Sequence, residues 1–195
     1  MIIHALVEGY MESLFLPVIF SQIGRSDLQL NIRNAGGGDK FWSIAKRFNK
    51  AGAYTSAIGL TDLEQARCAP SLLADKLPDK APGFHLRLAV RMLESWLLAD
   101  RQAMAQFLKV PIRLLPTDPD SEQHAKRLLV NIARMSKSRA IRDAVVPDDS
   151  GGVVGTDYVA TMGKFIEHHW RASVARKSSH SLEKACQRWF DIAAV

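Results

Sequence analysis

Four short strand-like segments that alternate with helical patterns constrain the fold of this chain more than any other feature. The first, Ile2–Val7, is an apolar run, and hydrophobic residues then recur at helical spacing over residues 11–23. Further strand-like segments occur at residues 28–32, 54–60 and 84–89. Strands that alternate with helices of about 10–15 residues favour right-handed crossovers. The sequence therefore predicts an α/β, Rossmann-like fold with a mainly parallel sheet of about four strands flanked by helices.

This alternation stops near residue 110. The proline-rich segment 111–119 is followed by helical patterns at residues 121–135, 158–169 and 181–190, with a glycine-rich loop predicted at residues 147–155. Trp170 and Trp189 are suitable packing anchors. At 195 residues the chain fits one domain of ordinary size, or a core domain with an extension. We predict an α/β domain at residues 1–110 and a helical C-terminal extension at 111–195 packed on it.

Acidic residues follow two of the predicted strands directly. Glu8 comes after the first strand, and Asp62 and Glu64 come after the third. If the two strands are parallel neighbours, their carboxyl ends bring the three side chains to one edge of the sheet, where α/β proteins place their ligands. Crowded carboxylates repel one another unless a divalent cation neutralises them. Oxygen ligands suit Mg²⁺ or Mn²⁺, so the pattern predicts a metal site.

A plainer interpretation of the same acids stays open. Glu8 is placed to cap the helix that follows it, and Asp62 and Glu64 are placed to cap the next helix, because a negative charge near a helix N-terminus is favourable. Position alone does not choose between capping and metal binding.

Several short motifs resemble a known domain. The order strand-Glu-Gly, then strand-Asp-x-acid, resembles the Toprim domain of topoisomerases, primases, recombination proteins and overcoming-lysogenization-defect (OLD) type nucleases. The sequence Val7-Glu8-Gly9 followed by Glu12, together with residues 59–64 and 91–100, is similar to a bacterial Toprim-related family of unknown function that is often encoded beside ATPases. Residues 137–142, 146–147, 155–158 and 179–182 extend that likeness over nearly the whole chain.

The resemblance implies roles for individual acids. Glu8 would be a general acid/base or a metal ligand, and Asp62 and Glu64 would hold the metal. Glu64 departs from the usual Asp-x-Asp pattern, which bears on catalytic competence. Glu94 is a further candidate ligand, whereas Asp100 follows it by six positions and does not share its helix face.

Basic residues offer candidate contacts to a polyanion. The chain has a formal net charge of +6, which favours phosphate-rich partners without defining a site. A basic stretch at residues 126–142 could follow a nucleic-acid backbone, or it could be a solvated helix face. Gly36-Gly37-Gly38 is read as a plain loop, with a phosphate cradle as the alternative. The candidate nucleic-acid contacts are Lys40, Lys126, Arg127, Arg134, Lys137, Arg139 and Arg142.

The sequence does not support a membrane-spanning protein, a disulfide-framework protein or a zinc protein. No apolar run approaches the roughly 18 residues that a membrane span needs, and the two cysteines suit neither a disulfide framework nor a zinc site. We expect a cytoplasmic protein of undetermined oligomeric state. The expected function is Mg²⁺- or Mn²⁺-dependent phosphodiester chemistry on nucleic acid, as the effector of an ATPase-linked phage-defence system. The alternative is a catalytically silent module that binds nucleic acid or an ATPase.

Overall fold

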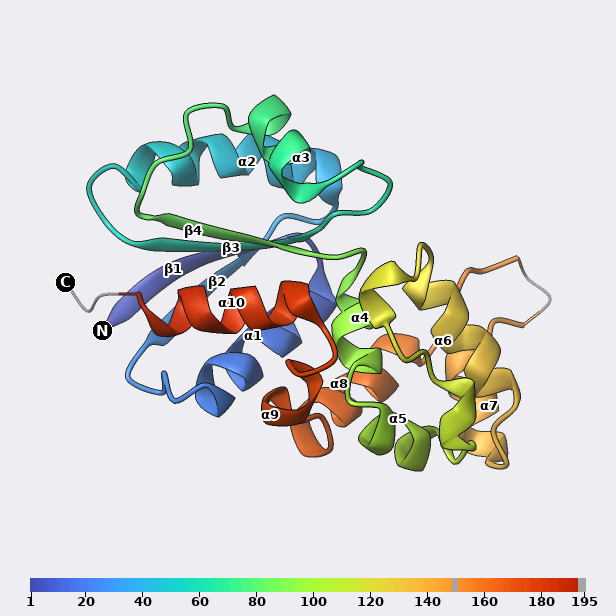
Figure 1. Cartoon of the computed structure of the whole chain (residues 1–195). Helices are drawn as coiled ribbons and strands as arrows, with labels where there is room; N and C mark the ends of the chain where they lie inside the picture. The colour runs from blue at the N-terminus through green and yellow to red at the C-terminus, as the bar shows by residue number, and fades with distance from the viewer. Residues whose placement is uncertain (149–150, 193–195) are drawn as a thin grey trace.

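A four-stranded, all-parallel sheet lies at the centre of the chain (Figure 1). The computed structural model describes residues 1–148 and 151–192. The strand order is β2-β1-β3-β4, and every neighbouring pair is parallel. The predicted α/β fold is therefore confirmed. The strands are β1 (Ile2–Val7), β2 (Gln29–Asn34), β3 (Ala57–Asp62) and β4 (Phe84–Ala89).

Helices cover both faces of this sheet. The crossovers are α1 (Tyr10–Gln22), α2 (Gly38–Ala51) and α3 (Ala69–Lys76). Figure 1 shows α2 and α3 on one face and α1 on the other. The chain reverses its direction across the sheet after β2, so right-handed connections place α1 and α2 on opposite faces. This leaves the β3–β4 half of the α1 face to be covered by another element.

The C-terminal region supplies that element. Helix α10 packs against β4 and beside α1, while α8 packs along α1 (Figure 1). Helix α4, which follows β4, packs against α6. The remaining helices are α4 (Leu93–Leu98), α5 (Arg101–Leu108), α6 (Ala125–Arg134), α7 (Arg139–Val145), α8 (Tyr158–His168), α9 (Ala172–Ala175) and α10 (His180–Phe190), with short 3-10 turns at Ile112–Leu114 and Pro119–Ser121.

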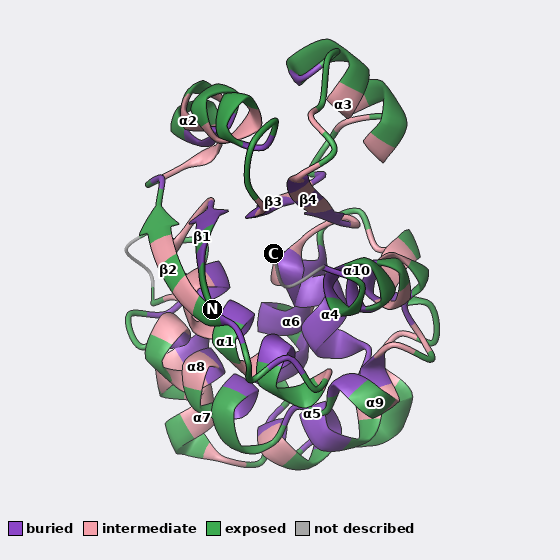
Figure 2. Ribbon diagram, turned by 90° about the vertical axis from the view of Figure 1, so that its left-hand side faces the viewer, coloured by how far each residue is buried: buried purple, intermediate pink, exposed green. Residues whose placement is uncertain are grey.

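The larger hydrophobic core lies between the sheet and the C-terminal helices (Figure 2). Phe15 of α1 contacts Trp170 at a ring-centroid distance of 4.8 Å, and Phe20 contacts Trp189 at 5.4 Å. Both tryptophans are buried, which confirms them as packing anchors. Residues from both sides of position 110 belong to this one core, and the division of the chain there stays a prediction.

Some predicted boundaries were wrong. The third strand begins at Ala57, because Tyr54 lies in the turn after α2 and is 93% exposed. The basic helix begins at Ala125, since Ser121, where it was predicted to begin, belongs to the 3-10 turn Pro119–Ser121. Residues 149–150 of the predicted glycine-rich loop lie outside the described residues. Within the described part of the chain, no helix is long and apolar enough to cross a membrane.

Candidate metal centre

The sheet topology places two of the predicted acids on either side of its switch point. The connection after β1 leads to β2 and the connection after β3 leads in the opposite direction to β4, and in open α/β sheets ligands bind at the carboxyl ends where this happens. Val7 pairs with Leu60 across β1 and β3, so the next residues, Glu8 and Thr61, are neighbours. Asp62 ends β3 one residue later.

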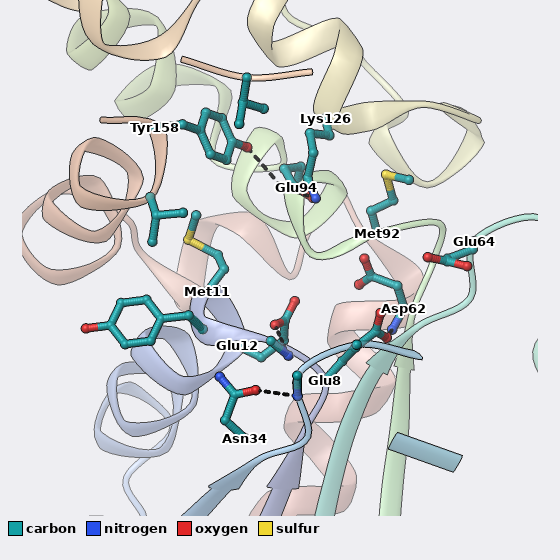
Figure 3. A pocket seen from close by; sticks show the side chains of 16 residues that line it. Glu8, Met11, Glu12, Asn34, Asp62, Glu64, Met92, Glu94, Lys126 and Tyr158 are labelled. Carbon is teal, nitrogen blue, oxygen red and sulfur yellow. Dashed lines mark hydrogen bonds and ion pairs between the residues drawn. The ribbon is translucent and has the colours of Figure 1, made fainter. Parts of the chain in front are cut away.

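A pocket of ≈ 490 Å³ opens at this edge (Figure 3). All four acids predicted as metal ligands line it, although they come from the turn after β1, the end of β3, the loop after β3 and α4. Residues of α1, α6 and α8 complete the wall. The charged and phenolic side chains of the lining are Glu8, Tyr10, Glu12, Asp62, Glu64, Glu94, Lys126 and Tyr158.

Hydrogen bonds hold the acids in place. The Thr61 hydroxyl donates to Glu8 Oε2, and the Asp62 backbone N–H donates to the same oxygen at 3.3 Å. Asp62 Oδ1 accepts from the N–H of Leu93, the first residue of α4, at 2.8 Å. Asp62 therefore also caps a helix, as the plainer interpretation expected, but that helix is α4 and not the next one along the chain.

Helix α1 is capped by Glu12 and not by Glu8. Glu12 Oε2 accepts from the Gly9 backbone N–H at 2.9 Å, at the spacing of a capping box. The side chain is nevertheless buried, with 8% exposure, and it lines the pocket. Glu12 was not among the predicted site residues, although its position three residues after Gly9 marks it as a helix-start acid.

Burial and mutual repulsion raise the pKa values of the central carboxyls. Burial raises the pKa of Asp62 well above its usual range, and the charges of Glu12, Glu94 and Glu8 raise it further. Burial likewise raises the pKa of Glu12 to about 7, with added repulsion from Glu94 and Glu8. These four carboxylates form one interacting group, which we call the acidic cluster. Glu64 is exposed and is not among the charges that perturb Asp62 or Glu12.

The C-terminal helices bring a cation and a phenol to the cluster. Lys126 Nζ of α6 lies 3.5 Å from Glu94 Oε1, and the Tyr158 hydroxyl of α8 donates to the same oxygen at 2.9 Å. Burial alone would lower the pKa of Lys126, but Glu94 and Asp62 raise it overall. Burial, followed by the charge of Glu94, raises the pKa of Tyr158 well above its usual range. The Lys126 charge therefore offsets part of the negative charge of the cluster.

Comparisons with protein-family models, curated proteins and solved structures give no match to this chain. The interpretation of the acidic cluster therefore rests on its own geometry.

In the part of the chain that the structure describes, no three His, Cys, Asp or Glu side chains already form a group that could hold a metal ion. Glu8, Glu12 and Glu94 are each held by a hydrogen bond from Thr61, Gly9 and Tyr158, respectively.

The other predicted basic residues lie apart from the cluster. Arg139 pairs with Asp143 at 3.3 Å, and Arg142 Nη1 donates to the Ser136 carbonyl at 2.5 Å. None of the predicted basic residues except Lys126 lines the acidic pocket. The exposed ones are Lys40, Arg127, Arg134, Lys137 and Arg139.

Two of the three amides in the glycine run are already engaged within the chain. The N–H groups of Gly36 and Gly37 both donate to the backbone carbonyl of Glu8, at 3.1 and 3.0 Å. Gly36 N–H also donates to Asn34 Oδ1 at 2.8 Å. The turn needs glycine because φ is +76° at Gly36 and +123° at Gly37. These contacts favour the plain-loop interpretation, and they fix the end of β1 at the pocket.

Asp100 has a structural place in the fold. It is fully buried, caps α5 through the N–H of Ala103 at 3.2 Å, and accepts two hydrogen bonds from the guanidinium of Arg171 at 2.8 Å each. Asp100 does not line the acidic pocket, in agreement with its separation from Glu94 on the sequence.

Proposed function

We propose that this chain carries out metal-dependent phosphodiester chemistry on nucleic acid, as a nuclease of Toprim type. The observation that carries the proposal is the position of the half-buried Asp62 at the switch point of the sheet, in one pocket with the carboxylates of Glu8, Glu12 and Glu94. Four carboxylates with one nearby ammonium group are unfavourable in the metal-free protein, and a divalent cation would neutralise them. A site that is unfavourable without its ligand is typical of function and is unusual for fold stabilisation.

The donor set fits a hard divalent cation such as Mg²⁺ or Mn²⁺, because it consists of carboxylate oxygens. Glu8, Asp62 and Glu94 are the residues that would hold it, with Glu64 as an additional ligand from the exposed loop. Their present hydrogen bonds would have to rearrange, since the carboxylates do not yet form a ligand group. A cation bound there would neutralise charge that develops on the phosphoryl oxygens.

The chain itself would bind the substrate and move the proton. Lys126 is 39% exposed at its side chain and can bind a phosphate oxygen at the pocket. Glu8 is the general acid/base that the resemblance implies. Glu12, with a pKa of about 7, also suits proton transfer near neutral pH. Tyr158 orients Glu94 through its hydrogen bond.

The motif resemblance supports the same function and suggests a partner. Its closer family is often encoded beside ATPases, so we propose that the chain acts as the effector of an ATPase-linked system, in defence against phage. A second candidate is a catalytically silent module that binds nucleic acid or an ATPase. Two observations favour it: Glu64 is exposed outside the acidic cluster, and the described acids are not arranged as a ready metal site.

The test is cleavage of plasmid and single-stranded DNA and RNA, with Mg²⁺ or Mn²⁺ and with chelator, by the chain alone and together with the proposed ATPase partner. We expect cleavage only with the divalent ion, and a loss of about 100-fold or more in Glu8→Gln, since a general acid or base contributes about 10²–10⁴-fold. Glu167→Gln is the matched control, because Glu167 is exposed on α8 and does not line the pocket.

Two outcomes would contradict the nuclease proposal. One is equal cleavage by the wild type and Glu8→Gln. The other is no cleavage by the wild type with any of these substrates and ions, which would favour the silent module.

A further inference from the structure

A second charged surface lies along the edge strand of the sheet. Lys80 precedes β4, Arg87 lies on β4, and Lys184 and Arg188 lie on α10, which packs against β4 (Figure 1). We call these four residues the β4–α10 strip. Arg87 and Lys184 line a cavity of ≈ 240 Å³ that shares no lining residue with the acidic pocket. The strip is therefore a separate feature of the surface.

The positive charges of the strip are not compensated. None of its four residues forms an ion pair with any residue that the structure describes. Arg87 Nε is shielded from solvent and, within the same described part of the chain, has no hydrogen-bond partner. A buried donor without a partner costs about 1–3 kcal/mol.

The nearby carboxylates are engaged elsewhere. Glu183 of α10 pairs with Arg176, with Arg176 Nη2 at 2.9 Å from Glu183 Oε1. Asp120, which lines the cavity beside Arg87, accepts from Ser179 Oγ at 2.6 Å and from the Ser181 N–H at 2.9 Å. Asp120 therefore supports the start of α10, and Glu183 supports the contact of α10 with the end of α9. Neither acid forms an ion pair with the strip, which stays cationic.

The cations of the strip also repel one another. Burial lowers the pKa of Arg87, and the charge of Arg188 lowers it further. Burial lowers the pKa of Lys80 as well, followed by repulsion from Arg87 and Arg188. Lys184 and Arg188 stand four positions apart on one face of α10, where like charges are unfavourable. Lys80 Nζ donates to the carbonyls of Ala81 and Phe84, at 3.2 and 2.8 Å, but the repulsion among the cations is unfavourable for the fold and points to an anionic ligand.

The spacing of the charges suits a polymer. His180, Lys184 and Arg188 repeat every four residues along α10, which places them about 6 Å apart along the helix axis. Protein–protein interfaces are depleted in lysine and in charged residues at their centre, although arginine is enriched in them. Interfaces with nucleic acid are much more positively charged. A chain of phosphodiesters therefore fits the strip better than a protein surface does.

We propose that the β4–α10 strip binds the phosphate backbone of a nucleic-acid strand, at a surface separate from the acidic pocket. The choice of nucleic acid rests on the proposed function. The strip would hold a part of the substrate strand that lies outside the acidic pocket. It differs from the basic residues that the sequence suggested, because its charges come together only when α10 packs on β4.

The test is binding of fluorescent single-stranded and duplex oligonucleotides in EDTA, followed by anisotropy at several salt concentrations. Lys184→Gln/Arg188→Gln is the test variant, and both residues are exposed, so it should fold normally. Loss of two phosphate contacts is expected to weaken binding about tenfold or more, and to reduce the slope of log K against log salt by about 1.4–1.8. The control is Lys46→Gln/Lys50→Gln, which removes the same charge from exposed positions on α2.

The result that overturns the inference is equal affinity in the test and control variants, or no binding by the wild type. A poly-glutamate arm covers the other class of partner. If the test variant loses poly-glutamate binding but retains oligonucleotide binding, the strip takes an acidic protein segment and the inference is wrong. If the wild type shows strip-dependent binding but cleaves none of the substrates, only the nuclease proposal is contradicted.

Discussion

Replacing Asp62 by asparagine is expected to stabilise the metal-free protein and, in the same variant, to abolish Mg²⁺-dependent cleavage. Asparagine removes one of four interacting carboxylates, yet it keeps the oxygen that accepts from Leu93 N–H. Relief of an unfavourable functional site commonly yields about 0.5–2 kcal/mol. For a chain of this size, each kcal/mol of added stability raises Tm by about 2–4 °C. Cleavage should fall by about 100-fold or more.

The control is Glu64→Gln, which should leave the Tm of the metal-free protein unchanged, because Glu64 is exposed and does not perturb Asp62.

The stability gain of Asp62→Asn should also depend on pH. The raised pKa values of Asp62 and Glu12 mean that the folded wild type holds extra protons in mildly acidic solution. The stability that these protons contribute is therefore lost as pH rises from about 4.5 to about 7, and the advantage of the variant grows over that window. A lower Tm for Asp62→Asn at the higher pH would show that the acids are structural.

Replacing Lys126 by methionine is expected to act in the opposite direction on stability. Lys126 is the cation that offsets Glu94 and Asp62, and Glu94 is only 2% exposed. Loss of a partner from a fully buried pair costs about 3–5 kcal/mol, but solvent screens the partly exposed Lys126, so we expect about 1–2 kcal/mol. Thermal unfolding of the metal-free variant measures the loss. Mn²⁺ should restore more stability to this variant than to the wild type.

The two substitutions should also be coupled. If Lys126 acts by neutralising the acidic cluster, Lys126→Met should destabilise an Asp62→Asn background less than it destabilises the wild type. The same loss in both backgrounds would contradict this account and would leave only the packing of the lysine stem.

The sequence was sufficient to place the centre of this site but not its walls. Glu8 and Asp62 could be paired because two strand-like segments end in acids, and the carboxyl ends of parallel neighbours meet at one edge. The helical crossovers likewise required a parallel sheet. Such inferences depend on the local spacing of hydrophobic residues and on the handedness of crossover connections. Both can be inferred from short segments of sequence.

The docking of the C-terminal helices was not predictable in the same way. Lys126 could be read only as part of a basic stretch, and Tyr158 only as the start of a helix, because neither has a sequence signal that ties it to Glu94. Glu12 carried a signal for helix capping, which hid its place in the pocket. The same limit applies to Arg188, whose position near Arg87 follows from the packing of α10 on β4.

The most direct test of the acidic cluster as a metal site is an anomalous difference map from crystals soaked in Mn²⁺. We predict a peak in the pocket coordinated by the carboxylates of Asp62 and Glu8, and no such peak in crystals of Asp62→Asn. A wild-type map with no peak in the acidic pocket, at a Mn²⁺ concentration that supports cleavage, would contradict the account.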